Sequence, residues 1–123
     1  MLVKRFLAVC AALLILALVP GACPAPGEGA KAERGYRRAA PVLAAIEEYR
    51  RELGSYPDSL TQLTPQFLEP AAVAVPTRPQ EQYPLEYERD STGFVLTFRY
   101  VGPGMNECRY TAAKREWECS GYF

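Results

Sequence analysis

Residues 83–100 read YPLEYERDSTGFVLTFRY, and this stretch decides the fold. Aromatic and aliphatic side chains alternate with polar ones on both sides of the turn-forming sequence DSTG, which is the pattern of a β-hairpin. A loop over DSTG places Tyr87 opposite Leu96. The same register places Leu85 opposite Phe98, so the apolar rows of both strands share one face. The stretch therefore predicts an antiparallel hairpin with an apolar face and a polar face.

A second hairpin is predicted after the Gly-Pro-Gly turn at residues 102–104. Cys108 and Tyr110 have the same parity in one strand, as do Trp117 and Cys119 in the next. A register that pairs the two cysteines also brings Tyr110 near Trp117, which is consistent with a disulfide across the hairpin. A metal site is the alternative interpretation, but two cysteines in a chain without histidine make a poor one.

A long amphipathic helix is predicted from about Lys31 to Leu53, because apolar residues recur there at spacings of three and four. Pro41 indicates either a kink or a helix whose strong part starts there, and Gly54 is a natural stop. The apolar stripe consists of Tyr36, Ala39, Leu43, Ile46, Tyr49 and Leu53. The stripe and the apolar sheet face would each be exposed alone, so we expect them to pack together. The predicted domain, residues 31–123, is thus α+β, with one N-terminal helix on an antiparallel meander of about four strands.

The first 22 residues have the pattern of a secretory signal. Lys4 and Arg5 precede an unbroken apolar run of 14 residues, Phe6–Val19, and a positive start followed by a short apolar run is typical of such signals. The run is shorter than the roughly 20 residues that span a membrane comfortably. A buried core helix is the alternative, but it would carry two positive charges at its N-terminus and a helix-breaking Pro-Gly sequence at its C-terminus. We expect export from the cytoplasm and removal of residues 1–22.

The sequence VPGAC at residues 19–23 resembles a bacterial lipobox, in which small residues precede a cysteine that is acylated and becomes the new N-terminus. Pro20 stands where that pattern usually has an aliphatic residue, so ordinary signal-peptidase cleavage nearby and an uncleaved anchor stay open. The resemblance implies a lipid on Cys23 and attachment to a membrane of the bacterial envelope, on its periplasmic side. The proline- and glycine-rich residues 23–30 predict a flexible tether to the domain.

Composition excludes several classes of function. After residue 22 the chain carries 12 basic and 14 acidic side chains, a net charge of −2. This charge balance does not provide the positively charged surface that nucleic-acid binding requires. Histidine is absent, and this removes the imidazole bases and most catalytic zinc sites. The sequence has no phosphate-binding glycine loop, nucleophile elbow or calcium loop. We therefore expect no catalytic residues, no metal, no cofactor and no small-molecule substrate.

Two charged side chains on the predicted hairpins could be interpreted as catalytic. Glu86 and Glu88 lie two apart on one strand and could form a catalytic carboxylate pair. We expect instead a solvent-facing surface that Arg99 and Arg109 neutralise, because nothing nearby would bury the carboxylates.

An aromatic row on the same hairpins could be a carbohydrate-stacking platform, although its parity matches the core face, which favours packing. The row consists of Tyr83, Tyr87, Phe94, Phe98, Tyr100, Tyr110 and Trp117. Tyr122 and Phe123 have no place in that row. We therefore predict that these two residues form an exposed contact with a partner.

The end of the predicted helix and the turn after it resemble type II secretion pseudopilins. Residues 44–49 read AAIEEY and residues 53–60 read LGSYPDSL, similar to the aromatic near the helix end, the Gly-x-Tyr-Pro sequence and the leucines typical of those proteins. The pair Cys108 and Cys119 looks like the disulfide-closed C-terminal region of type IV pilins. The leader departs from a prepilin leader, because it lacks the glutamate of the processed helix and breaks at Pro20. The acidic calcium loop of the major pseudopilins is missing as well.

The resemblance implies a pilin-like head that is detached from its polymerising stem and carries another anchor. We expect a non-enzymatic envelope lipoprotein that binds another envelope or secretion component. The alternative is an accessory pseudopilin of a type II secretion or type IV pilus-like system, with a retained hydrophobic N-terminus.

Overall fold

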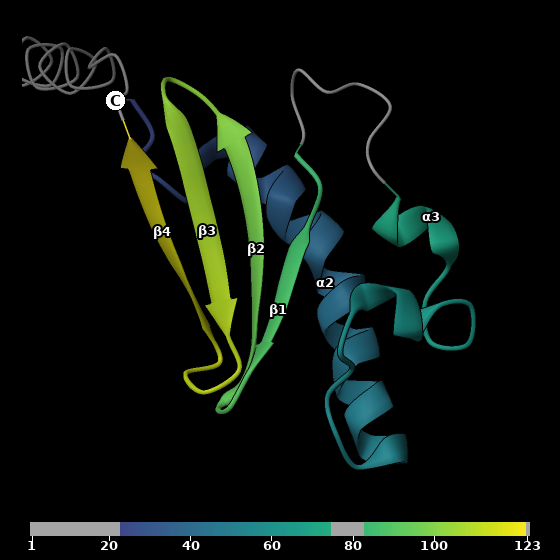
Figure 1. The fold of residues 1–123 in the computed structure, drawn as a ribbon. Coiled ribbons are helices and arrows are strands. Elements are labelled where there is room, and N and C mark those ends of the chain that lie inside the picture. Colours follow the sequence, from purple (N-terminus) through teal and green to yellow (C-terminus); the bar gives the residue numbers. More distant parts are fainter. Residues whose placement is uncertain (1–22, 75–82, 123) are drawn as a thin grey trace, which may run out of the picture.

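The computed structural model describes residues 23–74 and 83–122, so the predicted signal at residues 1–22 lies outside the described residues. The fold is α+β, as predicted: a long helix packs on one face of a four-stranded antiparallel sheet (Figure 1). The elements are α2 Gly29–Leu53, η2 Leu60–Leu63, α3 Pro70–Val73, β1 Glu86–Asp90, β2 Gly93–Val101, β3 Met105–Thr111 and β4 Glu116–Tyr122.

The sheet is a meander in the order β1-β2-β3-β4. Tyr87 lies opposite Leu96, so the register predicted for the first hairpin is confirmed. The ladder continues to the pair Asp90 and Gly93, one pair further than predicted. The carboxylate of Asp90 explains the tighter turn, because its Oδ1 accepts hydrogen bonds from the Thr92 amide at 2.8 Å and the Thr92 hydroxyl at 2.7 Å. The hydrogen bond from the Thr92 side chain is also the main reason that the pKa of Asp90 is lowered.

Helix α2 starts at Gly29, inside the segment predicted as a tether, and runs through Pro41 without ending. It stops at Leu53, and Gly54 follows in the left-handed conformation with its amide donating to Arg50 O at 2.8 Å. Most of the predicted stripe packs in the core, because Ala39 and Ile46 are buried and Tyr36, Leu43 and Tyr49 pack against the buried residues. Leu53 was predicted wrongly, since it is 59% exposed. The buried residues are Ala32, Gly35, Ala39, Val42, Ala45 and Ile46. Small side chains dominate this face since the helix lies close to the sheet, and larger ones flank it.

The closest approach of α2 to β2 is at Gly35. A Cβ at this position would lie 2.2 Å from Cε2 of Phe98, so any larger residue would have to displace the ring. Phe98 is 1% exposed and has its ring centroid 5.1 Å from those of Tyr36 and Trp117. All residues of the predicted aromatic row except Tyr83 belong to the core clusters or pack against them, as their parity predicted. Tyr83 precedes β1 and is in neither cluster.

The turn after α2 packs against the first hairpin. Pro57 is buried, and its carbonyl accepts a hydrogen bond of 2.6 Å from the hydroxyl of Tyr87. Burial is the main cause that raises the pKa of Tyr87 to about 12. Tyr56 lies edge-on to Phe94 with ring centroids 5.0 Å apart. The Gly-Ser-Tyr-Pro segment thus ties the end of α2 to β1 and β2.

Candidate functional site

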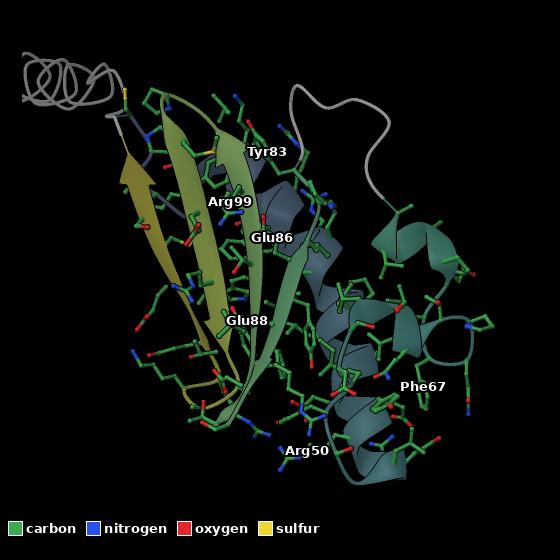
Figure 2. All side chains as sticks on the ribbon, viewed as in Figure 1. Arg50, Phe67, Tyr83, Glu86, Glu88 and Arg99 are labelled. Carbon is green, nitrogen blue, oxygen red and sulfur yellow. A yellow bond between two sulfur atoms is a disulfide. The ribbon has the colours of Figure 1, made fainter. Side chains whose placement is uncertain are left out.

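The face of the sheet turned away from α2 is polar and slightly hollowed. Figure 2 shows Glu86, Glu88 and Arg99 on this side, which we call the outer face. Its depression has a volume of about 320 Å³. The lining residues are Glu86, Tyr87, Glu88, Val95, Thr97, Arg99, Glu107 and Arg109. Strands β1, β2 and β3 therefore all contribute to one open polar surface.

Arg99 organises the charges of the outer face. Its Nε donates to Glu107 Oε2 at 2.8 Å, and its NH1 contacts Glu86. The hydrogen bond with Glu107 is the largest cause that raises the pKa of the Arg99 guanidinium. Arg109 reaches only Glu107, with Nε 4.0 Å from Oε1. Partly exposed ion pairs contribute at most about 1 kcal/mol each, so their main effect is to set the charge pattern.

Glu107 is the member of this network that sequence reasoning did not select. It lies opposite Arg99 in the ladder between β2 and β3, and its side chain is 17% exposed. The sequence could have placed Glu107 on the outer face, because it lies two residues before Arg109 in the same predicted strand and so faces the same side of the sheet. Arg99 therefore contacts two carboxylates, whereas Arg109 contacts neither Glu86 nor Glu88, contrary to the expectation from the sequence.

The end of the outer face near the β3–β4 turn has unpaired acidic groups. Within residues 23–74 and 83–122, Glu88 and Glu116 are exposed and form no ion pair. In the ladders they belong to one row across the sheet, because Val95 pairs with both Glu88 and Thr111, and Thr111 pairs with Glu116. The buried hydroxyl of Thr111 has no hydrogen-bond partner among the described residues. The exposed carboxylates of Glu88 and Glu116 can accept hydrogen bonds or positive charge from outside the chain.

The predicted disulfide between Cys108 and Cys119 is confirmed, with an S–S distance of 2.07 Å. The two residues lie opposite each other in the ladder between β3 and β4. Cys108 is fully buried, and the hydroxyl of Tyr36 lies 3.3 Å from Cys119 Sγ. The bridge is therefore part of the core beside α2.

Cys23 is an exposed free cysteine, and the segment after it is more ordered than a flexible tether. The Gly27 amide donates to the hydroxyl of Tyr100 at 2.8 Å, and the hydroxyl of Tyr36 donates to Gly27 O at 3.1 Å. Glu28 N donates to Ala25 O at 2.9 Å and closes a turn. The predicted tether of residues 23–30 is thus shortened by a docked turn and by the first residues of α2.

One of the two predicted partner residues, Tyr122, lies at the end of β4. Tyr122 is the last residue of that strand and pairs with Met105 of β3. Phe123 lies outside the described residues.

The described part of the chain contains no group of three or more acidic or cysteine residues that could hold a metal ion. None of its helices is both long and apolar enough to cross a membrane. No family model matches the chain, and neither the curated proteins nor the solved structures contain a match.

Proposed function

We propose that this chain is a non-enzymatic envelope lipoprotein whose pilin-like head binds another envelope or secretion component. The observation that carries the proposal is the contrast between the two faces of the sheet. One face is covered by α2, whereas the outer face has a polar depression with unpaired acidic groups at one end. A surface of this kind suits contact with a basic partner, since complementary charges steer association and fix its register.

The pilin-like relationship rests on three features that occur together. A long N-terminal helix lies on an antiparallel meander, and the Gly-Ser-Tyr-Pro turn that follows it packs against the first hairpin. A disulfide joins the last two strands. Fold-level likeness does not determine function, so the partner is inferred from the outer face and not from the fold.

A binding role is favoured over catalysis by the way the carboxylates are used. Glu86 and Glu107 both contact Arg99, so these carboxylates are held in ion pairs within the chain. The depression is also open, so it does not exclude water from a reacting group. A charged and solvated surface of this kind is suited to recognition.

Acylation of Cys23 is the first expected result. Protein extracted from membranes should have an intact mass that corresponds to a chain starting at Cys23 with attached lipid, because the VPGAC sequence resembles a lipoprotein processing site and the thiol is exposed. A Cys23→Ser variant should lack the mass of the lipid. A soluble, unmodified mature form would contradict lipidation, and retention of residues 1–22 would favour the alternative, an accessory pseudopilin.

Partner binding through the outer face is the second expected result. A photo-crosslinking residue in place of Val95 should capture one envelope protein in living cells, whereas the same residue in place of Ala44, an exposed position of α2, should not. Reversing both Glu88 and Glu116 to lysine should weaken capture by at least about tenfold, which corresponds to about 1.4 kcal/mol.

Three outcomes of this experiment are decisive. The control Glu52→Lys changes an exposed charge on α2, and it should leave both capture and melting temperature unchanged. Equal capture by the double variant would contradict a partner on the outer face. Loss of capture with Tyr122→Ser or Phe123→Ser would place the contact at the end of β4 instead.

A further inference from the structure

The turn at residues 24–28 is fixed to one end of the sheet. The backbone of Gly27 is hydrogen-bonded to Tyr100 and to Tyr36. Gly27 has a positive φ of 85°, and a Cβ there would lie 2.6 Å from Cys119 Sγ, so only glycine fits this contact. The chain is therefore held against the body only four residues after Cys23.

An apolar hollow of about 290 Å³ lies beside Cys23. Cys23, Pro24 and Ala30 line it from the N-terminal side, and Tyr100 and Pro103 line it from the sheet. Most of its wall is carbon, in contrast to the polar outer face. The hollow is thus suited to hydrocarbon more than to a charged ligand.

The surface around this hollow combines exposed apolar groups with the basic side chain of Lys31 and the carboxylate of Glu28. The Glu28 Oε2 accepts a hydrogen bond from the Ala25 amide at 3.3 Å. Val101 is 38% exposed, Pro103 is exposed and Met105 is half-buried. The Lys31 amine donates to Val101 O at 2.6 Å at the rim of the hollow. Apolar side chains next to a lysine amine match the boundary between acyl chains and phosphate groups.

The reach of the chain limits where a membrane anchor can be. Four residues span at most about 14 Å when fully extended, and Gly27 is docked at this end of the sheet. An acyl chain on Cys23 would enter the bilayer here. The apolar run Phe6–Val19 ends four residues before Cys23, so a retained hydrophobic N-terminus would also enter close by.

We propose that the end of the domain formed by residues 23–31 and 101–105, the anchor end, lies directly against the bilayer. The hollow beside Cys23 takes the glyceryl group and the first methylenes of the lipid. This proposal rests on the membrane anchoring in the proposed function and adds the orientation of the head.

The orientation determines which surfaces a partner can reach. Figure 1 places the β2–β3 turn at the anchor end, and the β1–β2 and β3–β4 turns at the opposite end of the sheet. Strand β2 has nine residues, so its first and last Cα atoms are about 26 Å apart at roughly 3.3 Å per residue. Glu88 and Glu116 lie towards the far end and would face away from the membrane.

Tryptophan quenching by brominated lipids tests this orientation. The full chain is expressed with its own leader, extracted from membranes and reconstituted into phosphatidylcholine vesicles with brominated acyl chains. Val101→Trp reports from the anchor end, and Ser91→Trp, at an exposed position of the β1–β2 turn, is the matched control. Quenching of Trp117 is measured in the unchanged protein and subtracted. We expect at least about threefold more quenching at residue 101 than at 91, because bromine quenches only at short range and the sheet separates the two sites.

Each outcome supports or overturns the orientation. Equal quenching at both sites, or more at residue 91, in protein that floats with the vesicles overturns the orientation and leaves the anchoring intact. Protein that does not float with the vesicles overturns both. Met105→Trp is a second reporter from the anchor end, in case Val101→Trp lowers the melting temperature, and it should give the same result as Val101→Trp.

Discussion

Phe98→Ala is expected to lower the free energy of unfolding by about 3 to 5 kcal/mol. Phe98 is 1% exposed and fills the space above Gly35, where α2 has no side chain of its own. Its ring also contacts Tyr36 and Trp117. Truncation of Phe98 leaves a cavity, and the helix and the sheet can collapse only partly into it. The free-energy cost of this cavity therefore adds to the lost free energy of burying the ring. Urea denaturation followed by circular dichroism measures the change.

Leu53→Ala is the matched control for Phe98→Ala. Both substitutions remove a large apolar side chain, but Leu53 is 59% exposed, so its loss should stay within about 0.5 kcal/mol. Together the two variants test which face of α2 packs on the sheet. Similar values for both variants, or a larger loss at Leu53, would contradict the observed packing and favour the burial of Leu53 predicted from the sequence.

Cys108→Ser is expected to lower the free energy of unfolding by about 2 to 3 kcal/mol, because the disulfide closes a short loop and restricts the unfolded chain. The sequence separation of the bridged residues is 11. A second effect follows from the contacts of Gly27, which packs against Cys119. Without the bridge, the turn at residues 24–28 should lose protection from amide hydrogen exchange, while the helical circular dichroism signal stays largely in place.

Cys23→Ser is the control for loss of a thiol. Cys23 is exposed and unbridged, so this substitution should leave the melting temperature of the detergent-solubilised protein unchanged. Thermal unfolding and hydrogen exchange of both variants compare the two sites directly. An unchanged melting temperature for Cys108→Ser, or two free thiols in protein unfolded directly from its native compartment, would show that the bridge does not stabilise the domain.

The features predicted correctly from the sequence depend on near neighbours in the chain. The alternation on both sides of DSTG sets the register of Tyr87 with Leu96, since a slip by one residue would turn every apolar side chain outwards. The parity of Cys108 and Cys119 sets the second hairpin and its disulfide in the same way. Gly54 marks the end of α2. The charge pairing was predicted only in part, because Glu107 becomes a partner of Arg99 through the ladder between β2 and β3.

Only the tertiary structure decided how the helix meets the sheet and where the N-terminal segment lies. A helical period identifies a stripe of apolar residues, but it does not show how closely the helix approaches the sheet. At Gly35 the helix has no side chain, and the ring of Phe98 from β2 occupies the space where one would be. The turn at Gly27 looks like a flexible proline- and glycine-rich linker in the sequence. It is ordered by Tyr100, which is 73 residues away along the chain. Local patterns thus determined the elements and their faces, whereas contacts between distant residues determined the packed face of α2 and the docked turn beside Cys23.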